Sequence, residues 1–348
     1  MKRRAFMLSC LLSAIADATP QYAKVLRGLA LQFPRDHGAH PDFRTEWWYV
    51  TGALDSPRKE IGFQLTFFRV RTGFAETLSS PIAASQILFA HAAVTLPGDK
   101  LLHADRAARA NLGAGFSTTD CEVHIGAWQM RRSVSDVFTL KAQDAQFLFD
   151  FSLTPTQPKM LQGDVGFSQK GARAEQASYY VTWPQLQVDG NIVLDGKSQR
   201  AQGKAWLDHE WSSEVLGEAD VGWDWLGINL ADGGALMAFR IRNEAGATVF
   251  AHATLRGTSG RTQSWSGADV QFKALRKWRS ARGTEYPVET ELRFGPHIIR
   301  TKPTIDDQEL STRRPAPVTY WEGLVQVEGT LIGRGYLELT GYAGKIVM

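Results

Sequence analysis

The chain has 348 residues, of which 43% are hydrophobic and 22% charged, with 11 Trp and 18 Phe. At roughly 100 to 200 residues per domain, this length corresponds to two domains or one large one, and the apolar content excludes wholesale disorder. Lys+Arg 39 against Asp+Glu 36 gives a formal net charge of +3 with both signs interspersed, so we expect no nucleic-acid partner.

The N-terminal residues 1–18 have a basic start, an apolar run of about a dozen residues and a small-x-small end, ADA. This order predicts a secretory signal peptide and therefore an exported, periplasmic protein. The apolar run is shorter than the roughly 20 residues of a transmembrane helix, so we expect no membrane span. An amphipathic helix or lipid attachment at Cys10 are the alternatives. Without the leader, Cys121 is the sole cysteine, which excludes an intramolecular disulfide and a cysteine-based zinc site.

Strand patterns dominate the chain after residue 45. Runs rich in aromatic and β-branched residues, several with period-two alternation, predict strands. These runs cover residues 62–71, 86–96, 146–154, 179–188, 225–242 (a hairpin), 248–255, 288–294 and 323–342 (two strands). Two stretches, 105–110 and 273–280, are compatible with short helices, although neither has a long apolar stripe at helical spacing.

Turn residues separate these runs and indicate an antiparallel meander. The turns are expected at residues 97–99, 189–190, 195–196, 232–234 and 243–246. A barrel of eight or so strands needs roughly 130 to 180 residues, so we predict an all-β fold of two β-barrels, with one large sandwich as the alternative. The polar, Gly-rich stretch 190–204 predicts the boundary, which gives domains 19–200 and 201–348.

Standard catalytic signatures such as G-x-S-x-G, H-E-x-x-H and the phosphate loop are missing from the sequence. Two segments instead crowd charged and aromatic residues together. Residues 33–52 read FPRDHGAHPDFRTEWWYVTG, and residues 205–225 read AWLDHEWSSEVLGEADVGWDW. We take these two segments as the candidate site.

Strand alternation sorts the second segment into two faces. The more apolar face carries Ala205, Leu207, His209 and Trp211 and is expected to be interior, which would place His209 beside Trp211 inside a pocket. The other face carries Trp206, Asp208 and Glu210. In the first segment, Glu46 shares a face with Trp48, and Trp47 with Tyr49. A bulge would invert the assignment.

A carboxyl group set among indole rings has a chemical use. Desolvation raises its pKa and keeps it protonated as a general acid, and aromatic faces can stabilise a carbocation formed by protonation of an alkene. The structural alternative is that the acids pair with Arg35, Arg44 or Arg240 while the tryptophans fill a barrel. A metal held by Asp36, His37, His40 and Asp42 is a further option, but neighbouring arginines compete for these acids, so we predict no metal and no cofactor.

Several motifs resemble one known family. Segment 33–52, AWLDHEWSS, GWDWLGINL, YWEG and GYLELTGY look like the AttH-like predicted secreted hydrolases, which group with the CrtC family of carotenoid 1,2-hydratases, or hydroxyneurosporene synthases. The likeness runs from about residue 33 to 342. It implies two tandem lipocalin-like (calycin) barrels. For the hydratase branch it implies cofactor-free addition of water to an isolated C=C bond of a long isoprenoid. The hydratases carry a D-H-N-W run, where this chain has Asp208, His209, Glu210 and Trp211.

The resulting hypothesis is an exported hydratase or hydrolase that acts on a hydrophobic, isoprenoid-like small molecule. Asp208 is the leading acid, with Glu46, Asp224 and Glu322 as substitutes, and His209 is the base or proton shuttle. The expected pocket lining is Trp48, Trp211, Trp223, Trp225 and Tyr320, while Asp36, His37 and Arg44 orient the first segment. One rival is a non-catalytic periplasmic carrier of a lipid or pigment. The other makes both segments an ion-pair cluster between domains.

Overall fold

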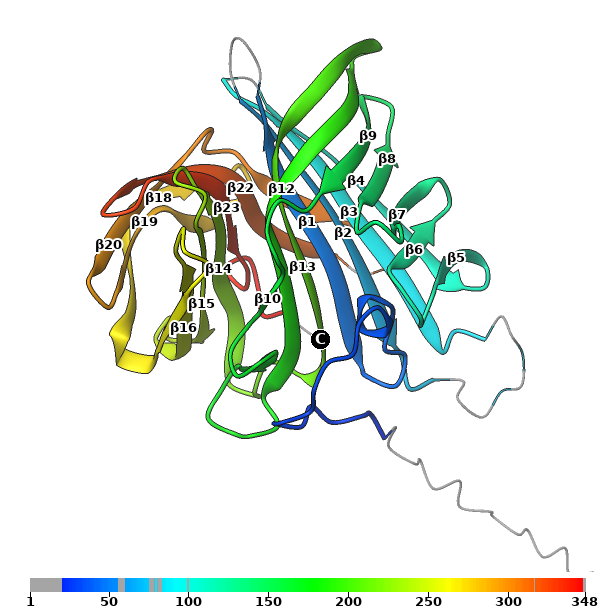
Figure 1. Ribbon diagram of the computed structural model, residues 1–348, viewed down its shortest axis with the longest axis horizontal. Helices are drawn as coiled ribbons and strands as arrows, with labels where there is room; N and C mark the ends of the chain where they lie inside the picture. The colour runs from blue at the N-terminus through cyan, green and yellow to red at the C-terminus, as the bar shows by residue number, and fades with distance from the viewer. Residues whose placement is uncertain are drawn as a thin grey trace, which may run out of the picture.

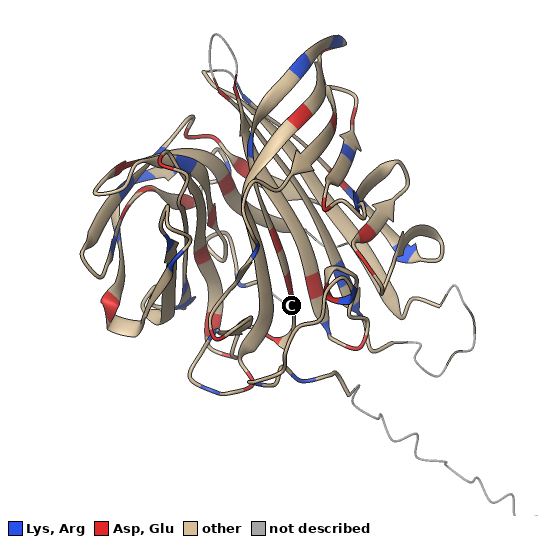
Figure 2. Cartoon of the chain, viewed as in Figure 1, with Lys and Arg blue, Asp and Glu red and all other residues tan. Residues whose placement is uncertain are grey.

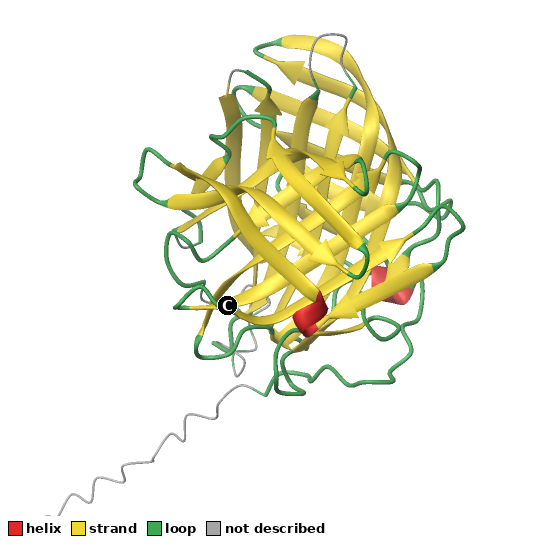
Figure 3. Ribbon diagram, turned by 90° about the vertical axis from the view of Figure 1, so that its left-hand side faces the viewer, coloured by secondary structure: helices red, strands yellow, loops and turns green. Residues whose placement is uncertain are grey.

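The computed structural model describes residues 21–55, 60–74, 78, 80, 83–98, 100–315 and 317–346. These residues form strands almost throughout, and the helical elements among them are two short 3-10 turns, η1 (Arg35–His37) and η2 (Gly267–Asp269) (Figure 3). None of the helical segments in these ranges has the length and apolar character that crossing a membrane requires. The predicted signal peptide, residues 1–18, lies outside the described residues.

The first sheet is 13-stranded and closes into a barrel (Figure 1). Neighbouring strands follow one another from β12 through β13 and β1 to β9, and β9 pairs back onto β12, while β10 and β11 also pair with β12. The strands are β1 (Thr45–Leu54), β2 (Ile61–Arg71), β3 (Gln86–Leu96), β4 (Lys100–Ala110), β5 (Gly113–Phe116), β6 (Glu122–Ile125), β7 (Trp128–Arg132), β8 (Phe138–Gln143), β9 (Phe147–Thr154), β10 (Met160–Leu161), β11 (Phe167–Gln169), β12 (Ala177–Leu194) and β13 (Lys197–Glu214).

The second sheet is 10-stranded and curls into an open barrel beside the first. Its order is β17-β16-β15-β14-β23-β22-β20-β19-β18, with β21 paired to β22. The strands are β14 (Asp220–Leu230), β15 (Ala235–Asn243), β16 (Thr248–Arg256), β17 (Thr262–Ser266), β18 (Val270–Arg279), β19 (Glu285–Phe294), β20 (His297–Pro303), β21 (Glu309–Thr312), β22 (Val318–Gly329) and β23 (Gly333–Leu339). Basic and acidic residues are interspersed along the strands of both sheets (Figure 2).

The all-β, two-barrel prediction is confirmed, while three local predictions are wrong. The proposed helix 105–110 is part of β4, and residues 273–279 of the other belong to β18, because pairing with β3 and, across register shifts, with β19 outweighs local propensity. The predicted turn at Asp189-Gly190 lies within β12. A Cβ atom on Gly190 would overlap the carbonyl oxygen of Asp150, so glycine here permits the close approach of β9.

The change of sheet lies between Glu214, the end of β13, and Asp220, the start of β14. The expected division at residue 200 falls inside β13, which is a single strand of the first sheet. The polar stretch 190–204 that suggested a linker belongs to the paired β12–β13 hairpin, and its polar side chains are largely exposed.

Three apolar clusters explain the strand patterns. One fills the first barrel, one fills the second sheet, and a third joins the outer face of the first barrel to the second sheet. Strand β9 alternates buried and more exposed residues, as a strand with one buried face does. Strand β1 and residues 205–212 of β13 are buried on both faces, because the second sheet covers their outer side. The candidate segments therefore lie between two cores.

Candidate functional site

A cavity lies where the outer face of the first barrel meets the second sheet. Its volume is about 80 Å³, and an apolar cavity of roughly 150 Å³ holds benzene, so it admits one small group, such as the end of a chain. The first wall includes Trp47, Tyr49, Tyr180 and Asp208. The second wall includes Trp223, Trp225, Glu322 and Glu338.

Asp208 lies on the first wall, directly opposite Tyr49 in the β1–β13 register. Its Oδ2 accepts a hydrogen bond from Tyr180 Oη at 2.7 Å, and its Oδ1 accepts bonds from Thr182 Oγ1 at 2.6 Å and Trp206 Nε1 at 2.9 Å. Burial raises the pKa of Asp208 to about 7, although these donors favour the ionised form. The carboxyl group is therefore oriented by three donors and can hold or release a proton near neutral pH.

Two glutamates face each other on the second wall. Glu322 of β22 and Glu338 of β23 are directly paired in register. Burial, and then the charge of Glu338, raises the pKa of Glu322 well above its ordinary value. Burial raises the pKa of Glu338 to about 7, and Trp223 Nε1 donates a 2.8 Å hydrogen bond to its Oε2. Like-charged carboxylates side by side cannot both ionise cheaply, so this pair holds a proton.

A buried ion pair completes the first wall. Lys170 Nζ lies 2.7 Å from Glu210 Oε1, and the ammonium group also lies 4.1 Å from the ring centroid of Phe239. Ser178 Oγ donates a hydrogen bond to the same Glu210 oxygen. The positive charge of Lys170 is therefore balanced by the Glu210 carboxylate. The groups left for proton transfer in the cavity are the carboxyl groups of Asp208, Glu322 and Glu338.

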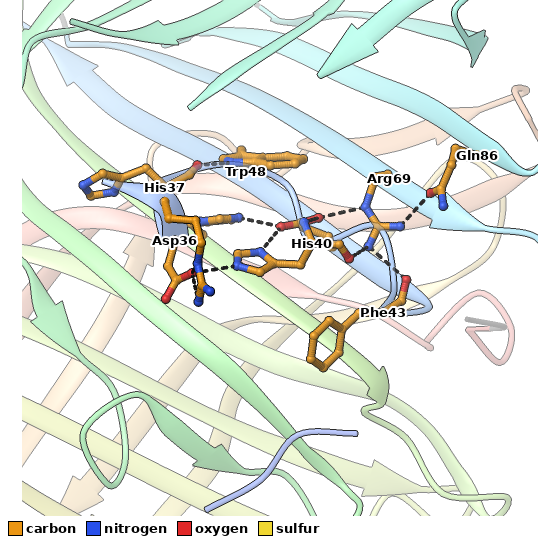
Figure 4. A network of polar contacts seen from close by, with 10 residues as sticks. Asp36, His37, His40, Phe43, Trp48, Arg69 and Gln86 are labelled. Atoms are coloured by element: carbon orange, nitrogen blue, oxygen red, sulfur yellow. Dashed lines mark hydrogen bonds and ion pairs between the residues drawn. The ribbon is translucent and has the colours of Figure 1, made fainter. Parts of the chain in front are cut away.

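A second polar network lies on the opposite face of the same strands, inside the first barrel (Figure 4). Glu46 Oε1 lies 2.8 Å from His40 Nδ1 and 2.9 Å from His209 Nε2, while its Oε2 accepts a 2.8 Å bond from Arg69 Nε. Burial opposes ionisation, but Arg69 and His40 hold the pKa of Glu46 well below its usual range. Asp36 Oδ1 lies 3.3 Å from His40 Nε2.

The pKa values of the two histidines in this network shift in opposite directions. Burial disfavours a charged ring at both, yet the carboxylates of Glu46 and Asp36 raise the pKa of His40. Burial dominates at His209 and lowers its pKa, so this ring is neutral. The rings stack on indoles: His40 lies 3.8 Å from Trp211, and His209 lies 4.8 Å from Trp48, between ring centroids. These aromatic contacts fix both rings.

His40, Glu46 and His209 are the described residues whose ligand atoms converge closely enough to consider a metal ion. The second oxygen of Glu46 is bound by Arg69, which is fully buried. The positive charge of this guanidinium would repel a divalent ion bound to Glu46. The Arg69 N–H group already satisfies the second oxygen of Glu46 as a hydrogen-bond donor. The donor set therefore fits a proton-linked ion-pair network better than a metal. An open groove of about 450 Å³ reaches His40 and Trp211, but its lining does not include His209.

The predicted site residues thus fall into different places. Asp208, Trp223, Trp225 and Glu322 line the cavity between the sheets. Glu46, His209, Trp48 and Trp211 lie together inside the first barrel. The two faces assigned from strand alternation are confirmed, since Leu207 and Trp211 lie in the core of the first barrel and Trp206 lies in the cluster between the sheets. The pocket expected beside His209 and Trp211 is wrong, because the cavity lies on the Asp208 side, which the second sheet covers.

Four other predicted residues lie outside the cavity lining, although the His37 carbonyl oxygen accepts a 3.2 Å hydrogen bond from Trp48 Nε1 of the inner group. Asp224 faces into the second sheet, where Arg240 Nε and Arg242 Nε donate to its two oxygens at 2.7 and 2.8 Å. Tyr320 Oη lies 2.8 Å from His91 Nδ1 between the sheets, outside the cavity lining. His37 packs on Trp183, and the Arg44 guanidinium lies 5.8 Å from the ring centroid of Tyr22.

Sequence reasoning missed Glu338, Tyr180 and Lys170. Residues 323–342 were predicted as two adjacent strands, but the turn was expected at residues 332–335, and the observed turn between Gly329 and Gly333 is what places Glu338 opposite Glu322. Tyr180 and Lys170 come from strand β12 and the segment before it, which lack the charge crowding of the two motif segments.

Comparisons with known proteins agree with this architecture. The AttH-like family model matches residues 24–342. An AttH protein of Nitrosomonas europaea has a solved structure that is 45% identical in sequence, with a TM-score of 0.85, over 92% of this chain and 99% of that chain. Kievitone hydratase of Nectria haematococca shares the fold at 14% identity, with a TM-score of 0.68, over 94% of this chain and 97% of that one. No curated protein matches the chain. Together with the two sheets, these matches show a lipocalin-like fold of two barrels, and the chain belongs to the AttH-like family.

Proposed function

We propose that the protein is a cofactor-free hydratase that adds water to the C=C bond of a hydrophobic, isoprenoid-like small molecule in the cavity between its sheets. One observation carries the proposal: desolvated carboxyl groups enter an aromatic cavity from both walls, Asp208 from one and the Glu322–Glu338 pair from the other. A general acid works best when its pKa lies near the working pH, which the surroundings of Asp208 provide.

The proposed reaction conserves atoms and charge. The π electrons of the alkene take the proton of Asp208, which leaves a carboxylate on Asp208 and a carbocation on the neighbouring carbon. The faces of Trp47, Trp223 and Trp225 surround this charge. Water bonds to the cation and gives its proton to the carboxylate of the Glu322–Glu338 pair. Return of that proton to Asp208 through solvent closes the cycle.

Support also comes from kievitone hydratase, which has the same fold and whose name states a hydration reaction. The cavity volume favours a ligand that inserts one end, because a whole lipid or pigment would exceed about 80 Å³. His209 is assigned a structural role, since its Nε2 is bonded to Glu46 on the far side of β13.

The test uses 2-methyl-2-butene as the smallest branched alkene, with kievitone as a larger probe, in water enriched in oxygen-18. We expect labelled 2-methyl-2-butanol from the wild-type protein and background amounts from Asp208→Asn. Isopentenyl acetate, assayed in parallel, separates ester hydrolysis from hydration. Binding of the alkenes without consumption by wild-type protein would contradict the proposal and favour a carrier.

Export is part of the same proposal and rests on residues 1–18. Cell fractionation of a strain that expresses the full chain should find the protein in the periplasm, with a mature N-terminus near residue 19. A full-length protein in the cytoplasmic fraction would contradict export.

A further inference from the structure

Two buried polar side chains of the cavity lining, and a third beside them, have atoms without a hydrogen-bond partner among the described residues. They are Tyr49 Oη, both ends of the Gln64 amide and Glu322 Oε1. Their residues are 6%, 1% and 2% exposed, so bulk water does not satisfy them. Buried polar groups are almost always hydrogen-bonded, so a group of unpaired atoms beside an open space indicates a bound partner.

The strand register brings these groups to the same place. Tyr49 and Glu322 line the cavity from opposite walls. Tyr49 is paired with Thr66 of β2, which also lines the cavity, and Gln64 lies two residues before Thr66 and hence on the same face. The Tyr49 hydroxyl and the Gln64 amide both lie close enough to the Glu322 carboxyl group to act on its pKa, but none of these contacts has the geometry of a direct hydrogen bond. The free space of about 80 Å³ exceeds the roughly 30 Å³ that one water occupies.

We propose that Tyr49, Gln64 and Glu322 together bind a single hydroxyl oxygen, which is a water molecule in the free protein and the alcohol group of a ligand in the loaded protein. The role of this oxygen as the attacking nucleophile rests on the proposed function. The binding site itself rests on the unpaired atoms and on the cavity.

The donors and acceptors match both occupants. A water can donate to Glu322 Oε1 and Gln64 Oε1 and accept from the Tyr49 hydroxyl, which leaves one lone pair directed into the cavity. An alcohol has a single O–H; it can donate to Glu322 Oε1 and accept from Tyr49 and from Gln64 Nε2. Both ends of the Gln64 amide are unpaired, so the same side chain serves in either case.

The site also lies beside the proposed acid. Tyr49 and Asp208 are direct cross-strand partners on one face of the sheet, and side chains in such pairs are neighbours. A proton from Asp208 and an oxygen held by Tyr49 can therefore reach adjacent atoms of one double bond. Tyr49, Gln64 and Glu322 become positioning residues for the water in this arrangement.

The test compares 2-methyl-2-butanol with 2,2-dimethylbutane, in which a methyl group replaces the hydroxyl, by following tryptophan fluorescence. We expect Tyr49→Phe to weaken binding of the alcohol by about 3- to 10-fold, the loss of one hydrogen bond, and to leave binding of the alkane unchanged. Tyr286→Phe is the matched control, since Tyr286 Oη is also buried and unpaired but lies in the core of the second sheet. It should change neither affinity.

A high-resolution crystal structure of the free protein gives a readout without any probe. We expect an ordered water within hydrogen-bond distance of Tyr49 Oη, the Gln64 amide and Glu322. A dry cavity, or direct Tyr49–Glu322 contact without water, would overturn the inference, as would equal weakening of both probes by Tyr49→Phe. If the water and the alcohol selectivity are found but no alkene is hydrated, the hydroxyl site stands and the proposed function fails.

Discussion

The inner and outer faces of strands β1 and β13 meet two polar clusters that differ in how their buried carboxyl groups are compensated. On the inner face, Glu46 is held by two histidines and a buried arginine, and its pKa lies well below the usual range despite burial. On the outer face, Asp208 and Glu322 have raised pKa values, and Tyr49 has an unpaired hydroxyl. Successive side chains of a strand point to opposite faces, so neighbouring residues of β1 or β13 belong to different clusters.

This difference separates stability from chemistry within one motif. A network in which every charge is paired stabilises one conformation and offers nothing to a ligand. Desolvated acids and unpaired polar atoms in a cavity destabilise the folded state, and they leave these groups available for proton transfer and ligand binding. The run Asp208-His209 therefore contributes Asp208 to the candidate chemistry and His209 to the inner network.

The largest expected effect is on turnover. Asp208→Asn removes the proposed acid and should lower hydration of 2-methyl-2-butene on the order of 10²- to 10⁴-fold, the usual contribution of general acid catalysis. His209→Gln, on the inner face of the same strand, should keep turnover per folded molecule within a few fold. Equal losses in both variants would remove the distinction between the two clusters.

The next effect is on stability and concerns the inner network. Arg69→Met leaves the Glu46 carboxylate buried beside the histidines without its guanidinium partner. Breaking a buried pair on one side costs about 3 to 5 kcal/mol, and we expect this loss in the free energy of unfolding from urea titration. A loss below about 1 kcal/mol would show that Glu46 is held by its histidines alone.

The cavity should make stability depend on pH in the opposite sense to a salt bridge. The folded-state pKa of Asp208, about 7, is above its ordinary value of 3.8, so its contribution is most favourable at low pH and is lost as pH rises towards 7. Asp208→Asn lacks this titration. Its stability relative to wild type should therefore increase on the order of 2 kcal/mol between pH 5 and 7. A constant difference would contradict the raised pKa.

The smallest effect is expected at an exposed ion pair. Arg27 Nη1 lies 2.7 Å from Asp164 Oδ2, and both side chains are more than half exposed, at 58% and 55%. Arg27→Met should lower stability by less than about 1 kcal/mol, because solvent and salt screen such pairs. Comparison of this loss with the loss for Arg69→Met shows how much burial adds to the stabilising effect of the ion pair in the inner network.

Much of this architecture follows from the sequence. Alternation placed His209 with Trp211 and Asp208 with Trp206 on opposite faces, and tight turns predicted an antiparallel all-β fold. Alternation does not reveal which face a second sheet will cover. Since β14, β22 and β23 pack on the outer face of β1 and β13, the cavity formed on the side of Asp208. Glu338 and Tyr180 reach it through tertiary packing, which no local pattern encodes.

The central claim is that Asp208 stays protonated in the cavity up to neutral pH. Infrared difference spectra of wild type minus Asp208→Asn, recorded from about pH 5 to 9, report the C=O stretch of this one carboxyl group. The account predicts a protonated-carboxyl band that is present at pH 5 and disappears with a midpoint near pH 7. Absence of that band at pH 5 and above would contradict it.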